Sequence, residues 1–206
     1  MRILRDFIFV KVDKKYRDEI ITKSGVKLYV DTTYRPEWHV TMKGEVVAIP
    51  EKLTDQYFEM KGIVPEVEVG DIAYFNYLVV DTVNEVKVGD QVFYKVDYPS
   101  IFAYMRNGEL NMVGSWVFVR PYIEQKEEKV GSLYLPEMLK SEERKDMGII
   151  YKIGKPLTHE HDLGLKSGDK ILFKRIAAFE IDVEGEKYYC MKQSRIMAKV
   201  LQSNYN

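Results

Sequence analysis

The chain has 206 residues, 46% of them hydrophobic, so it can bury a core as one large domain or two small ones. Its 31 lysines and arginines balance 32 aspartates and glutamates, which argues against nucleic acid as a partner. Cys190 is the only cysteine, so an intrachain disulfide and a multi-cysteine metal site are excluded.

The predicted elements are short strands. Runs of β-branched and aromatic residues alternate with polar ones, as is typical of strands. Turn signals such as Asn107-Gly108 and Glu184-Gly185 separate the runs. In chain order, the predicted strands are 7–12, 45–49, 91–94, 116–119, 170–173 and 196–201. Many short strands between frequent turns predict an all-β chain of barrels or sandwiches.

The two halves of the chain carry similar motifs in the same order. Five matches in one order predict a tandem duplication with a boundary near Gly114, giving domains 1–114 and 115–206. The matched pairs are 7–12 with 116–121, 24–28 with 131–135, 44–49 with 148–153, Gly89-Asp90 with Gly168-Asp169, and Met112 and Ser115 with Met191 and Ser194.

The first half is the longer one, and it contains two Gly-Asp stretches. Counted forward from Gly44, Gly70-Asp71 fits the second half better; counted back from Met112, Gly89-Asp90 fits better. We therefore expect an inserted hairpin at about 51–87, and either Gly-Asp stretch can be the counterpart of Gly168-Asp169.

Each half also contains an apolar tripeptide, and the one at 133–135 lies inside a long charged segment. Residues i and i+2 of an extended chain point to the same side, so Leu133 and Leu135 present one apolar face, with Tyr134 opposite. Composition alone favours a strand with one buried face. The matching positions, the glycine before each tripeptide and the charged flanks favour an exposed docking element instead.

With these motifs in this order, the chain resembles the GroES-type co-chaperonins, most clearly from Trp116 to Leu201. Its tandem organisation is similar to that of the double-domain co-chaperonins of chloroplasts. The resemblance implies two tandem, partly open β-barrels, a homo-oligomeric ring, and mobile loops whose apolar tripeptides dock onto a GroEL-type chaperonin ring. By position, the implied chaperonin-binding residues are Val26, Lys27, Leu28, Leu133, Tyr134 and Leu135.

The resemblance further implies a lid that assists ATP-dependent folding and needs no cofactor of its own, because the ATP belongs to the partner. In the family, the opening and closing strands pair between neighbouring subunits. The segment Trp116–Val119 matches both the closing strand of the first repeat and the opening strand of the second. One segment in this position would alter how chains assemble.

Other functions have weaker support. The sequence has no Gly-rich phosphate loop and no recognisable Ser/His/Asp arrangement, so we expect no enzyme. His159 and His161 have a spacing that suits a metal, but no third ligand is evident and we expect a solvated loop. The alternative function is a structural or adaptor β-protein that has lost chaperonin binding. With no apolar run of about 20 residues and no signal-peptide pattern, we expect no membrane partner and a cytoplasmic location.

Overall fold

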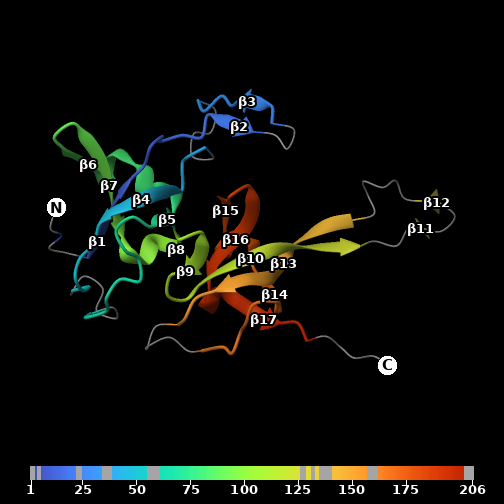
Figure 1. The fold of residues 1–206 in the computed structure, drawn as a ribbon. Coiled ribbons are helices and arrows are strands. Elements are labelled where there is room, and N and C mark those ends of the chain that lie inside the picture. Colours follow the sequence, from blue (N-terminus) through green and yellow to red (C-terminus); the bar gives the residue numbers. More distant parts are fainter. Residues whose placement is uncertain are drawn as a thin grey trace. The chain divides into compact units, whose positions relative to one another are not determined.

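The structure is a computed structural model that describes residues 3, 6–21, 25–33, 39–54, 61–125, 129–130, 133–134, 141–156 and 162–201. These residues form strands and short 3-10 turns, with no α-helix among them (Figure 1). The prediction of an all-β chain is therefore confirmed. Within the same residues, no helix has the length and apolar character needed to span a membrane. The chain divides into two compact units, Met1–Val113 and Gly114–Asn206.

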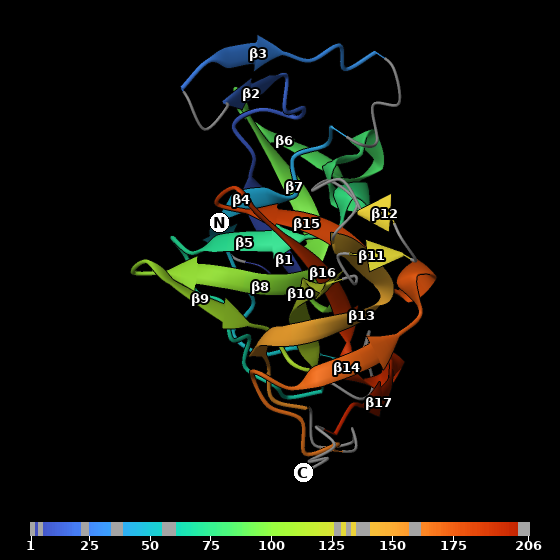
Figure 2. The ribbon, with the colours of Figure 1, turned by 90° about the vertical axis from the view of Figure 1, so that its right-hand side faces the viewer.

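Unit 1 is built on a seven-stranded antiparallel sheet in the order β6-β7-β1-β4-β5-β8-β9. A separate hairpin, β2–β3, lies away from this sheet (Figure 2). The strands are β1 (Phe7–Lys11), β2 (Glu19–Ile21), β3 (Lys27–Tyr29), β4 (Lys43–Ala48), β5 (Ile72–Phe75), β6 (Glu85–Val88), β7 (Gln91–Asp97), β8 (Ile101–Arg106) and β9 (Glu109–Met112). The 3-10 turns are η3 (Tyr77–Val80), η4 (Thr82–Asn84) and η5 (Tyr98–Ser100).

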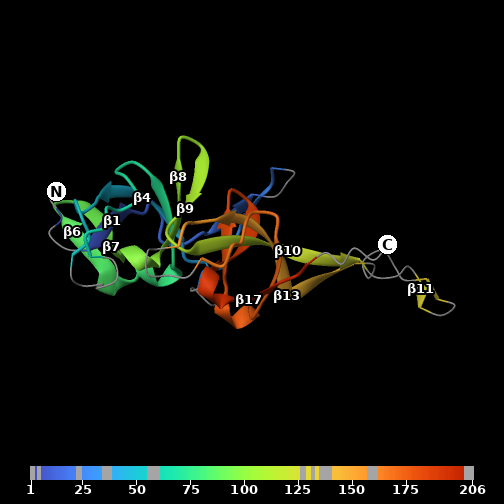
Figure 3. The same cartoon turned by 90° about the horizontal axis from the view of Figure 1, so that it is seen from below.

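Unit 2 is built on a six-stranded antiparallel sheet in the order β15-β16-β10-β13-β14-β17. A short hairpin, β11–β12, lies beyond the far ends of β10 and β13 (Figures 1 and 3). The strands are β10 (Trp116–Gln125), β11 (Lys129–Val130), β12 (Leu133–Tyr134), β13 (Ser141–Ile153), β14 (Lys170–Phe173), β15 (Phe179–Val183), β16 (Glu186–Lys192) and β17 (Ile196–Lys199). The 3-10 turns are η7 (Arg175–Ala177) and η8 (Gln193–Arg195).

Neither sheet closes on itself. Among the described residues, the end strands of each sheet (β6 and β9, β15 and β17) have one neighbour each. Alternation builds the cores, as in β1, where Ile8 and Val10 are fully buried between exposed or half-buried neighbours. This open architecture is consistent with two tandem, partly open β domains.

The two sheets share one strand order and one register. The run β6-β7-β1-β4-β5-β8 corresponds to β15-β16-β10-β13-β14-β17. In register, Val10 pairs with Tyr94 in unit 1, as Val119 pairs with Tyr189 in unit 2. β9 has no counterpart in the part of unit 2 that the structure describes.

Backbone hydrogen bonds identify the matching Gly-Asp. The Val46 N–H donates to the carbonyl of Asp71 (2.8 Å), as the Ile150 N–H donates to that of Asp169 (2.9 Å). Gly70 and Gly168 return equivalent bonds of 2.8 Å to Val46 and Ile150. Gly70-Asp71 is thus the counterpart of Gly168-Asp169, and Gly89-Asp90 instead forms the turn between β6 and β7.

This register also changes the matches near the ends of the repeats. Val117 pairs with Met191 and Ile8 pairs with Val96, so the counterpart of Met191 is Val96 and not Met112. The range 51–87, where we expected an inserted hairpin, carries β5 and most of β6 among its described residues, and both strands have counterparts in unit 2. Part of the additional length of unit 1 lies in the connections 49–71 and 76–84, which exceed 154–169 and 174–178, and part lies in β9.

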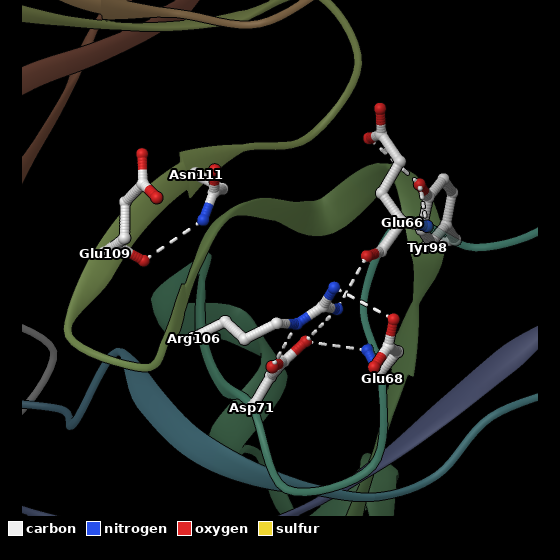
Figure 4. A network of polar contacts seen from close by, with 7 residues as sticks. All are labelled: Glu66, Glu68, Asp71, Tyr98, Arg106, Glu109 and Asn111. Atoms are coloured by element: carbon white, nitrogen blue, oxygen red, sulfur yellow. Dashed lines mark hydrogen bonds and ion pairs between the residues drawn. The ribbon is translucent and has the colours of Figure 1, made fainter.

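A buried carboxylate ties the segment before β5 to β8 (Figure 4). Asp71 is 4% exposed and receives Nε and Nη2 of Arg106 at 2.9 and 2.7 Å. The same guanidinium pairs with Glu68 (2.9 Å) and donates to the carbonyl of Glu66 (3.0 Å). In unit 2, Asp169 pairs with Lys199 of β17 at 2.8 Å. In each unit, therefore, an ion pair joins the aspartate of the Gly-Asp turn to the strand that follows a two-stranded hairpin of the sheet. This strand is β8 after β6–β7 in unit 1, and β17 after β15–β16 in unit 2.

Candidate functional site

Each unit extends a pair of chain segments away from its sheet. The first arm is defined as the described residues of 12–42, between β1 and β4. The second arm is defined as the described residues of 122–147, where β10 and β13 continue beyond the sheet (Figure 1). These two arms carry the tripeptides for which the sequence predicts a docking role.

The first arm is a paired ribbon for most of its described length. Near its base the Thr41 N–H donates to the carbonyl of Lys15 (2.9 Å), and the Arg17 N–H donates to that of His39 (2.7 Å). The pairing resumes in β2–β3, where Glu19 lies opposite Tyr29 and Ile21 opposite Lys27. The first tripeptide thus lies in the outer part of two chain segments that are paired by backbone hydrogen bonds.

The first tripeptide is exposed. Val26 is 54% and Leu28 is 50% exposed, and they point to one side because they are two residues apart. Lys27 lies between them and pairs with Glu19 across the hairpin (3.3 Å). Gly25 turns the chain just before them with a φ of 82°, a left-handed conformation that glycine adopts without strain. Tyr29, which follows Leu28 in the chain, is 79% exposed.

The second arm continues the core strands β10 and β13. Tyr122 pairs with Arg144 and Gln125 with Ser141, so the ladder runs to the last residue of β10. Farther out, Val130 pairs with Leu133 and Lys129 with Tyr134 in the hairpin β11–β12. Two predicted residues, Leu133 and Tyr134, lie in this hairpin. The third, Leu135, lies outside the described residues, as do Gly131 and Ser132.

The base of the second arm has a break in register and contacts across it. The pairing shifts between Pro121 and Tyr122, opposite residues 145–147. Arg144 spans the break, with Nη1 3.4 Å from Glu124 and Nε 3.0 Å from Asp146. The hydrogen bond from Arg144, followed by its charge, lowers the pKa of Asp146. On the body side, Lys170 Nζ lies 3.5 Å from the centroid of the Tyr122 ring.

Other candidate chemistry has little geometric support. In the part of the chain that the structure describes, no three His, Cys, Asp or Glu side chains gather as a metal site would require. His159 and His161 lie outside the described residues. Cys190 is fully buried, and burial raises the pKa of its thiol well above the usual value, which disfavours the reactive thiolate. The exposed apolar pair Val26 and Leu28 on a paired arm is an arrangement suited to binding.

Comparisons with known proteins point to one family. The family model described as the chaperonin 10 kDa subunit matches residues 109–200. Co-chaperonin GroES of Rickettsia conorii is 34% identical over 84 residues, which is 39% of this chain and 85% of that protein. Co-chaperonin GroES of Porphyromonas gingivalis is 33% identical to this chain over 40% of this chain and 88% of that protein. Co-chaperonin GroES of Kosmotoga olearia is 32% identical over 43% of this chain and 92% of that protein.

Proposed function

The chain belongs to the chaperonin 10 kDa (GroES) family of co-chaperonins, and from this premise we propose that it binds a GroEL-type chaperonin ring through the tips of its arms. The contact residues are Val26, Lys27, Leu28, Leu133, Tyr134 and Leu135. Bound in this way, the chain acts as a lid in ATP-dependent protein folding. We also propose that each of the two units is one GroES-like domain, so that the chain carries two such domains in tandem.

One observation carries this proposal: Val26 and Leu28 are exposed together at the end of an ordered ribbon. Burying one leucine contributes about 1.5–3 kcal/mol, whereas fixing one backbone residue costs about 1–2 kcal/mol. A tip on a paired ribbon has less backbone left to fix, yet two apolar anchors still give a weak contact. Several tips on one assembly raise the overall affinity by about 100–10,000-fold, which suits a lid that must also be released.

Assembly of several chains is supported by the sheet edges. β8 is covered by β9, which lies just ahead of β10 in the chain. Its counterpart β17 has one neighbour, β14, among the described residues. Ile3-Leu4 precede Asp6-Phe7 as Met112-Val113 precede Ser115-Trp116. The segment before β1 of a second copy therefore has the composition to cover β17, and repeated head-to-tail contacts of this kind can close a ring.

The test of the docking proposal is co-elution of the full chain with a purified GroEL-type chaperonin, with and without nucleotide. One variant carries Val26→Ser and Leu28→Ser, and another carries Leu133→Ser and Leu135→Ser. A matched control carries Val64→Ser and Leu163→Ser, at exposed apolar positions outside the arms. We expect nucleotide-dependent co-elution that falls at least tenfold in either arm variant and stays unchanged in the control.

Two outcomes would contradict the proposal. No co-elution of the wild-type chain with any of several chaperonins would favour the adaptor alternative. Co-elution that is retained when both arms are substituted would mean that a different surface makes the contact.

A further inference from the structure

A tyrosine occupies the same position in both units. Tyr94 of β7 pairs with Val10, and Tyr189 of β16 pairs with Val119. On their other sides they pair with glutamates, Glu85 and Glu180. Both side chains are buried, at 6% and 4% exposure. A buried tyrosine needs a partner for its hydroxyl, so the surroundings of the two hydroxyls are informative.

In unit 2, the Tyr189 hydroxyl reaches the second arm. Its ring packs in the core, 5.5 Å from that of Phe173, and lies under the guanidinium of Arg175 at 4.5 Å. The hydroxyl donates a hydrogen bond to the carboxylate of Glu143. Glu143 lies opposite Ile123, on the arm side of the register break. This hydrogen bond therefore joins the body of the sheet to the arm across the break, in addition to the contact of Lys170 with Tyr122.

The Tyr189 hydroxyl keeps its proton for this bond at neutral pH. Burial, followed by the hydrogen bond and charge of Glu143, raises the pKa of Tyr189 to about 12. A protonated hydroxyl facing a carboxylate forms one of the stronger classes of hydrogen bond.

In unit 1, Tyr94 lies near the base of the first arm. Burial raises its pKa, Glu85 and Tyr16 raise it further, and Lys15 lowers it. Lys15 and Tyr16 belong to the first arm at the point where it pairs with residues 40 and 41. The two tyrosines thus share a strand position and a cross-strand glutamate.

We propose that Tyr189 is a positioning residue that holds the base of the second arm against its own sheet and so fixes the direction in which the tip is presented. That Tyr189 holds the base of the second arm follows from its hydrogen bond to Glu143 alone. The benefit for docking rests on the proposed function. A two-stranded ribbon is marginally stable by itself, and a ribbon held in its binding direction loses less freedom on docking.

Tyr188 supplies a matched control. It is the neighbour of Tyr189, is equally buried at 4% exposure, and faces the other side of the sheet. Its ring stacks on those of Phe118 and Tyr151, and its hydroxyl donates to Glu186 of the same strand (2.5 Å). Tyr188→Phe and Tyr189→Phe remove the same atom, but only Tyr189→Phe removes a hydrogen bond to the second arm.

Hydrogen exchange of the full chain measures the effect directly. In Tyr189→Phe, we expect amides of 122–125 and 141–144 to exchange about tenfold faster, the change expected on losing one hydrogen bond to a charged group. The amides of Ile150 and Ile171 in the core, which report general stability, should keep their rates. Tyr188→Phe should leave the second arm unchanged.

The proposal is overturned if arm exchange in Tyr189→Phe equals that of the wild type, or if arm and core amides accelerate equally. Association with a GroEL-type chaperonin supplies a second readout, and we expect it to be slower in Tyr189→Phe with its nucleotide dependence retained. If the wild-type chain binds no chaperonin, the proposed function fails, whereas the exchange data still decide the role of Tyr189.

Discussion

The glycines of β4 and β13 show how one missing side chain permits a close approach of two strands. A Cβ on Gly148 would lie 2.8 Å from the carbonyl oxygen of Arg120, and one on Gly44 would lie 2.7 Å from that of Lys11. The backbone carbonyl cannot swing away as a side chain can. The sequence predicted a strand opened by glycine at both positions, but not this reason for it, because the opposing carbonyl belongs to a distant segment.

Gly148→Ala tests this close approach. We expect the substitution to destabilise unit 2 by about 1–3 kcal/mol, since the added carbon must push β10 and β13 apart. Gly164→Ala is the comparison, because its Cβ would meet nothing within 4 Å and its left-handed backbone alone costs about 1 kcal/mol. Urea denaturation followed by circular dichroism measures both. A Gly148→Ala protein as stable as the wild type would contradict this account.

At the scale of elements, sequence patterns identified strands that alternate between buried and more exposed residues, as well as the fully buried start of β10. The runs at 7–12, 116–119 and 170–173 contain β1, the start of β10 and β14. The continuation of β13 into the second arm was not predicted, since Ser141–Asp146 is exposed on both sides and shows no apolar alternation. Its highly charged composition is equally typical of a loop, so only the pairing partner reveals a strand.

Spacing in the sequence could not distinguish the two Gly-Asp stretches either, because the residue that contacts the buried aspartate lies far away in the chain. The carboxylate of Asp71 is recognised by Arg106, which is 35 residues away in the chain. Burial raises the pKa of Asp71, but hydrogen bonds from Arg106 and the Glu68 N–H, with the charge of Arg106, lower it below the usual value overall. A folded pKa below that of the unfolded chain stabilises the fold above about pH 4, and this stabilisation is lost as the pH falls through the folded pKa.

We therefore expect Asp71→Asn to lower the stability of unit 1 by about 2 kcal/mol at pH 7. The difference from the wild type should narrow near pH 3, where the wild-type carboxylate is also being protonated. Asp90→Asn, in the exposed Gly-Asp turn, should change stability little at either pH. Urea titrations at pH 7 and pH 3 make the comparison. Equal losses for the two variants at pH 7 would mean that Asp71 has no special structural role.

At the scale of the whole molecule, the sequence predicted the family, and the similarity to the chaperonin 10 kDa subunit over 109–200 confirms it for the second half. The contact residues at the arm tips and the assembly of chains stay predictions. Both depend on partners, and a sequence describes only one side of such a contact.

Assembly through β17 makes a direct prediction. Replacing Ile3 and Leu4 together by aspartate should prevent the segment before β1 from covering a neighbouring β17, because charged side chains would replace its apolar ones. We expect sedimentation velocity to show an oligomer for the wild type and a single chain for the variant. Val64→Asp, at an exposed position away from the sheet edges, should sediment as the wild type. A wild-type chain that sediments as a monomer, or a variant that stays assembled, would contradict this mode of association.

In unit 1, β9 pairs with β8, and the chain then continues directly into unit 2. The two units are therefore always present together, because they belong to one polypeptide. Every closed ring of such chains carries two arms per chain, and its number of tips is therefore even. A partner ring with an odd number of equivalent sites could never be matched one to one. Such a complex would contain at least one idle tip or one empty site, and docking would by itself break the rotational symmetry of the partner.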